Sequence, residues 1–150
     1  MNNRILFLDI DGVLLGKAGP GDTEIILAKY AAEFLKYSLE NYRCFWLTTH
    51  CRDGDSTHVI NLLKRYAHDN VIKLARDIIP VFWKTLKTEV IDINSDFYWI
   101  DDQLLWSEIQ WLDKNNALDR WIQIDTRRNP GDLKQAIFIL EEKIKTRLKR

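Results

Sequence analysis

Short apolar runs alternate along this chain with segments of helical periodicity, and this alternation constrains the fold most strongly. Three runs contain only apolar residues, which is typical of strands buried on both faces of a sheet. They cover residues 5–8, 44–47 and 97–100. We expect a fourth strand at residues 121–124. Residues 78–83 could form another strand, but Pro80 lacks a backbone donor and would place it at an edge or make it irregular.

Helical patterns fill the segments between these runs. We expect helices at residues 22–41, 59–67, 85–94, 104–114 and 132–144. Strands that alternate with helices form a parallel sheet covered by helices. The sequence therefore predicts a three-layer α/β/α sandwich around a parallel, Rossmann-like sheet of about five strands. A chain of 150 residues suits one domain of this kind, so we assign residues 1–150 to a single domain.

The composition excludes some classes of function. Lysine and arginine together number 22, as do aspartate and glutamate, so the formal net charge is zero. A dedicated nucleic-acid surface would need a basic excess, and we expect none. The longest apolar run, Ala136–Leu140, is far too short to cross a bilayer, so we expect no membrane partner. Two cysteines are too few for a disulfide framework, which favours a soluble, cytoplasmic protein.

Polar side chains end three of the expected strands. They are Asp9 and Asp11, Thr48 and Thr49, and Asp101 and Asp102. Ligands of parallel α/β sheets bind beyond the carboxyl ends of the strands, so we expect these groups to converge at one edge. Asp9 and Asp11 are two residues apart and can face one pocket, while Gly12 lets the chain turn sharply.

Carboxylates this close repel one another unless a cation or a shared proton relieves them. A site made only of oxygen ligands suits Mg²⁺. The alternative is that these aspartates only form turns and cap helices.

The pattern of these residues resembles that of the haloacid dehalogenase (HAD) superfamily, whose phosphatases carry four motifs on a parallel sheet. The first motif, an apolar run followed by D-x-D-G, is met by residues 5–13. The second, an apolar run followed by threonine or serine, is met by residues 45–48. The third is a lysine near a helix start, and the fourth, an apolar run followed by paired acids, is met by residues 98–102.

The resemblance implies a Mg²⁺-dependent phosphatase that forms an aspartyl-phosphate on Asp9. Asp11 would protonate the leaving group and then activate water. Asp9, Asp101 and the backbone carbonyl of Asp11 would hold Mg²⁺, with Asp102 assisting through water or as a further ligand. Thr48 would donate a hydrogen bond to the phosphoryl group, and the lysine would neutralise its charge.

Two assignments have competing candidates. Thr48 and Thr49 both follow the second strand, and we prefer Thr48 because it ends the apolar run. Lys84 and Lys87 could share one face of a helix. We prefer Lys87, which starts the more regular helical pattern, although either lysine could simply be solvated.

The substrate would be a phosphorylated small molecule or a phosphorylated end of a macromolecule. Candidate substrate-binding residues are Gly12, Thr49, His50, Arg52 and Lys84. Arg52 could bind a second substrate charge, although a solvated surface arginine is the alternative. The chain leaves no room for the cap domain of many HAD phosphatases, so the site would be open, covered by a small flap at residues 16–21 or by an oligomer partner.

The sequence is compatible with two other functions. One is a receiver-like phospho-acceptor domain, although such domains place their paired acids on the first strand and lack D-x-D-G. The other is a non-catalytic binding module that keeps the HAD fold.

Overall fold

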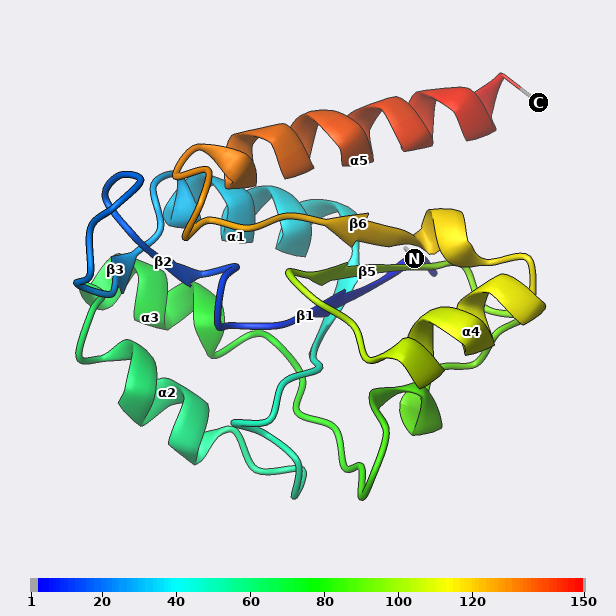
Figure 1. The fold of residues 1–150 in the computed structure, drawn as a ribbon, viewed down its shortest axis with the longest axis horizontal. Coiled ribbons are helices and arrows are strands. Elements are labelled where there is room, and N and C mark those ends of the chain that lie inside the picture. Colours follow the sequence, from blue (N-terminus) through cyan, green and yellow to red (C-terminus); the bar gives the residue numbers. More distant parts are fainter. Residues whose placement is uncertain (1–2, 150) are drawn as a thin grey trace.

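The computed structural model describes residues 3–149, and in it helices flank a parallel sheet (Figure 1). Within this range the strands of the sheet are β1 (Ile5–Leu8), β4 (Arg43–Trp46), β5 (Phe97–Asp101) and β6 (Trp121–Gln123). Their order is β4-β1-β5-β6, and each neighbouring pair is parallel. The predicted Rossmann-like α/β arrangement is confirmed, but the sheet has four strands instead of about five.

The sheet separates two hydrophobic cores, because successive side chains of a strand point to opposite faces. Leu6 and Leu8 of β1 belong to one core, whereas Phe7 between them belongs to the other. In β5, Ile100 and Trp99 divide in the same way. Both strands are therefore buried on both faces, which explains their uninterrupted apolar sequences.

Helices cover the two faces of the sheet (Figure 1). The helices are α1 (Ala31–Asn41), α2 (Thr57–Leu63), α3 (Asp69–Ala75), α4 (Trp106–Lys114) and α5 (Asp132–Leu148), with short 3₁₀ turns η1 (Lys87–Val90) and η2 (Leu118–Arg120). Buried residues of α1, α2, α3 and α5 join the core of Leu6 and Leu8. Leu112 of α4 joins the core of Phe7. Within residues 3–149, no helix has the length and apolar character needed to cross a membrane.

The prediction of a helix from residue 22 is wrong for its first part. The helix begins only at Ala31, and Ile26–Leu27 forms a short strand, β3, that pairs antiparallel with β2 (Leu15–Gly16). Tyr30 precedes the helix with a positive φ of 68°, which separates the hairpin from α1. The apolar residues at 26 and 27 fit a helical face equally well, and only pairing with the distant Leu15 favours the strand.

Residues 78–83 form an irregular segment beside the edge strand β4, which agrees with the effect expected of Pro80, whereas residues 85–94 differ from the predicted helix. Phe45 forms a single isolated bridge with Ile79, and Pro80 cannot extend it because it lacks an N–H group. The predicted helix at 85–94 reduces to η1, where the Glu89 carboxylate accepts the backbone N–H groups of residues 84–86. The expected helix at 59–67 ends at Leu63, and the separate α3 was not predicted.

Candidate functional site

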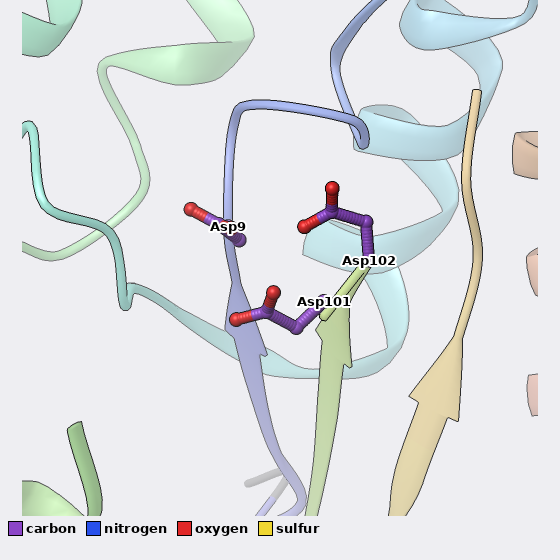
Figure 2. Close-up of side chains that lie close together, drawn as sticks. All are labelled: Asp9, Asp101 and Asp102. Atoms are coloured by element: carbon purple, nitrogen blue, oxygen red, sulfur yellow. The ribbon is translucent and has the colours of Figure 1, made fainter. Parts of the chain in front are cut away.

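Three aspartates lie together at the carboxyl ends of β1 and β5 (Figure 2). Asp9, Asp101 and Asp102 each offer a carboxylate oxygen, and these oxygens lie within 4.8 Å of one another. We call these three residues the acid cluster. Asp9 is 8% exposed and Asp101 is completely buried. Carboxylates that are removed from water in this way need a compensating charge.

The register of the sheet brings the acid cluster together. Leu8 of β1 pairs with Ile100 of β5, so the next residues, Asp9 and Asp101, emerge side by side. The backbone N–H of Asp9 still donates to the carbonyl of Ile100, at 3.1 Å, so the pairing of β1 and β5 continues as far as Asp9. Of the three strand ends that were predicted to converge, the fold brings the carboxylates at the ends of β1 and β5 into one cluster.

Gly12 leaves the space that Asp102 occupies. Gly12 has a positive φ of 74° in a tight turn after Asp11. A Cβ at this position would lie 2.3 Å from Oδ2 of Asp102, well inside van der Waals contact. Both the conformation and the close approach require glycine here.

Lys87 is the cation of the site. Its Nζ donates to Oδ2 of Asp101 at 2.7 Å and lies 3.5 Å from Oδ2 of Asp9. Lys84, the competing candidate, is exposed, and its carbonyl oxygen accepts a hydrogen bond from Arg52. Of the two lysines, the fold brings Lys87 to the acid cluster.

Burial dominates the electrostatics of the acid cluster. Burial, and then the charge of Asp9, raise the pKa of Asp101 to about 8, although Lys87 opposes this shift. The same two causes raise the pKa of Asp102. Burial lowers the pKa of Lys87, but the carboxylates of Asp9 and Asp101 outweigh it, and the net direction is upward. Lys87 thus pairs with two of the three carboxyl groups, and the oxygen atoms of the acid cluster could hold a metal ion.

Asp11 pairs with a histidine outside the acid cluster. Its Oδ2 lies 2.8 Å from Nε2 of His50. This hydrogen bond is the main reason why the pKa of Asp11 is lowered and the pKa of His50 is raised. The backbone N–H of His50 donates to Oγ1 of Thr48 at 3.3 Å. The loop after β4 is therefore tied to the D-x-D-G segment.

Thr48, Thr49 and Arg52 occupy different environments. Thr48 is completely buried, whereas Thr49 is exposed. Arg52 is exposed, with its guanidinium carbon 4.5 Å from the ring centroid of Trp83, and it donates to the carbonyl of Lys84. No hydrogen bond or ion pair among residues 3–149 connects Arg52 or Lys84 to the acid cluster.

The sequence analysis missed Thr126 and Arg127 as site residues. Thr126 is completely buried, and its Oγ1 donates to the carbonyl of Val13 at 3.0 Å. The positive charge of Arg127 contributes to lowering the pKa of Asp11 and opposes the rise in the pKa of Asp102. These residues follow the expected strand at 121–124, so the rule that polar groups gather at strand ends would have found them.

Comparisons of this chain with protein-family models, with curated proteins and with solved structures found no match.

Proposed function

We propose that this protein is a Mg²⁺-dependent phosphatase of the HAD type that acts through an aspartyl-phosphate on Asp9. One observation carries the proposal: Asp9 lies beside Asp101 and Asp102 at the carboxyl ends of two adjacent parallel strands, and Lys87 of η1 reaches Asp9 and Asp101. This combination joins a nucleophile, oxygen ligands for a cation and a positive charge for a phosphoryl group. The D-x-D-G segment and the paired acids also resemble the HAD motifs in their order along the chain.

Asp9 is the nucleophile of the proposed reaction. One of its carboxylate oxygens attacks phosphorus, and the bond between phosphorus and the leaving-group oxygen breaks. Lys87, 3.5 Å from this carboxylate, offsets the negative charge of the incoming phosphoryl group. Thr48, which follows the neighbouring strand β4, donates a hydrogen bond from its hydroxyl group to a phosphoryl oxygen. Water then attacks the phosphorus of the aspartyl-phosphate and regenerates the Asp9 carboxylate.

Asp11 and His50 hold the proton for the leaving group. They are paired at 2.8 Å, and the hydrogen bond between them lowers the pKa of Asp11 and raises that of His50, so the pair can hold one proton between its two side chains. As the ester bond breaks, Asp11 passes this proton to the leaving oxygen, and His50 becomes neutral. In the second step the pair accepts a proton from the attacking water.

The acid cluster would hold Mg²⁺. Asp9, Asp101 and Asp102 supply its carboxylate ligands, and the HAD resemblance adds the backbone carbonyl of Asp11. When bound, Mg²⁺ would neutralise charge on the phosphoryl oxygens. The protein's own contribution is to hold these oxygens together on two adjacent strands.

The segments that could cover the site are short. Between Asp11 and β4 lie only the β2–β3 hairpin and α1, and between β4 and η1 lie the short helices α2 and α3. We propose that residues 1–150 form one HAD-like domain without a cap, and that the hairpin acts as a small flap.

The test is hydrolysis of p-nitrophenyl phosphate with and without Mg²⁺. We expect Mg²⁺-dependent turnover that is lost in Asp9→Asn and kept in Asp113→Asn, a matched change of an exposed aspartate on α4. The proposal fails if Asp9→Asn hydrolyses the substrate as fast as the wild type. A stable phosphoryl group on Asp9 without turnover would instead identify a phospho-acceptor domain, and Mg²⁺ binding without either would identify a binding module.

A further inference from the structure

A groove adjoins the acid cluster on the side of the β2–β3 hairpin. Its volume is about 540 Å³, within the range of roughly 300–1,000 Å³ that is usual for small-molecule sites. Lys17 and the residues at 20–23 line one wall, and Asp125, Arg127 and Arg128 line the other. Asp102 lines both this groove and the acid cluster, so a molecule with one end at Asp9 can extend into the groove.

Thr126 fixes the two walls relative to each other. Its carbonyl accepts the backbone N–H of Lys17 at 3.2 Å, and its own N–H donates to the carbonyl of Gly12 at 2.9 Å. A Cβ on Gly16 would lie 2.4 Å from Oγ1 of Thr126, so the hairpin can approach this closely only with glycine. The groove is therefore a built feature of the fold, and its arginine follows directly after the residue that joins its walls.

Arg127 has unused hydrogen-bonding capacity. Its Nε is buried and has no hydrogen-bond partner within residues 3–149. The backbone N–H of Arg127 donates to Asp125, whose carboxylate also lies 3.6 Å from Nε of Arg128. Asp125 is thus occupied by these two groups. The side chain of Arg128 is 86% exposed, whereas Arg127 is partly buried beside the groove.

We propose that this groove binds a second anionic group of the substrate, with Arg127 as its main ligand and Lys17 on the opposite wall. The inference rests on the proposed phosphatase function and narrows its substrates to phosphate monoesters that also carry a carboxylate or a further phosphate. A guanidinium can donate two parallel hydrogen bonds to either group, which gives geometric selectivity as well as charge. The sequence analysis suggested that Arg52 could bind a second charge of the substrate, and we assign that role to Arg127 instead.

The test measures binding, so that it does not depend on turnover. The probes are phosphonates, which have no ester bond to hydrolyse: benzylphosphonate, its 3-carboxy derivative, its 3-phosphonomethyl derivative and its neutral 3-carbamoyl derivative. Calorimetry in Mg²⁺ buffer compares the wild type with Arg127→Gln, Arg127→Lys and Arg76→Gln. Arg76 is an exposed arginine that follows α3, and it lines neither the groove nor the acid cluster. Thermal unfolding of each variant checks that it folds.

We expect the wild type to bind at least one of the two anionic derivatives about tenfold or more tightly than benzylphosphonate, and the carbamoyl derivative no more tightly. The derivative that is favoured identifies the second group as carboxylate or phosphate. Arg127→Gln should reduce the preference below about threefold, Arg127→Lys should leave an intermediate value, and Arg76→Gln should keep it.

Equal affinities of the wild type for all four probes would overturn the inference, as would a full preference in folded Arg127→Gln. Failure of the phosphatase proposal alone gives a different result. The wild type would then still prefer an anionic probe and Arg127→Gln would still lose this preference, but no Asp9-dependent hydrolysis would be seen. If the protein hydrolyses phosphate esters but shows no preference for the anionic probes, the phosphatase proposal stands and the proposed role of the groove in binding a second anionic group is rejected.

Discussion

Replacement of Gly12 by alanine tests how closely the proposed metal site depends on the turn after Asp11. The new Cβ would lie 2.3 Å from Oδ2 and 2.7 Å from Cγ of Asp102. To reach ordinary van der Waals separation, the Asp102 carboxylate has to move by about 1 Å. Alanine must also adopt the positive φ of 74°, which costs about 1–2 kcal/mol for a residue with a Cβ.

These two effects have different consequences. The backbone cost lowers the free energy of unfolding without regard to the metal. The displacement acts on Mg²⁺, because its short bonds of about 2.0–2.1 Å and octahedral geometry do not tolerate a ligand that moves by 1 Å. We expect Gly12→Ala to weaken Mg²⁺ binding by about 10- to 100-fold, comparable to the loss of a supporting group at a metal site.

Gly54→Ala is the matched control. Gly54 also has a positive φ, of 81°, but a Cβ there would meet its nearest atom, Cβ of Phe82, at an ordinary 3.8 Å. This variant should lose a similar free energy of unfolding in urea and keep its calorimetric affinity for Mg²⁺. A Gly12→Ala protein that binds Mg²⁺ within about threefold of the wild type would refute the argument that Asp102 is a ligand held in place by the absence of a side chain at position 12.

Three further outcomes follow from the charges of the site. Because the pKa of Asp101 is about 8 without metal, Mg²⁺ competes with a proton for this carboxylate. The calorimetric affinity of the protein for Mg²⁺ should therefore rise up to tenfold per pH unit from pH 6 to 7.5 and level off above pH 8. An affinity that does not change with pH would contradict this prediction. Asp11→Asn should slow hydrolysis of an alkyl phosphate by about 10²–10⁴-fold and affect p-nitrophenyl phosphate less, whereas an unchanged alkyl rate would remove Asp11 from the acid role. His50→Gln should destabilise the metal-free protein by up to about 1 kcal/mol in urea, since Asp11 is 46% exposed. Because the pKa of His50 is raised, its contribution to the free energy of unfolding is complete below the ordinary histidine pKa and is lost as pH rises through the pKa of the folded state. Because the pKa of Asp11 is lowered, its contribution is complete above the ordinary aspartate pKa. The destabilisation of His50→Gln should therefore be clear at pH 6 and small at pH 9.

Local pattern was sufficient for the central strands of this fold. The uninterrupted apolar runs of β1 and β5 reflect burial on both faces, a property that each segment carries in its own residues. Ile26 and Leu27 were predicted wrongly for the opposite reason. Their structure depends on whether a distant segment offers backbone partners, and an apolar pair carries no information about that.

The residues of the candidate site also fall into two groups, those that the sequence placed and those that only the tertiary structure placed. The sequence alone determined that carboxylates follow two apolar strands, and parallel pairing makes their meeting at one edge nearly unavoidable. Only the tertiary structure decided that Lys87, not Lys84, reaches Asp9 and Asp101, and that Asp11 turns to His50. It also decided that Arg127, which follows the last strand, lines a groove together with residues of the β2–β3 hairpin. The position of a carboxylate at a strand end follows from the strand itself and from its parallel pairing. The position of a long side chain on a loop depends instead on contacts with residues far away in the chain.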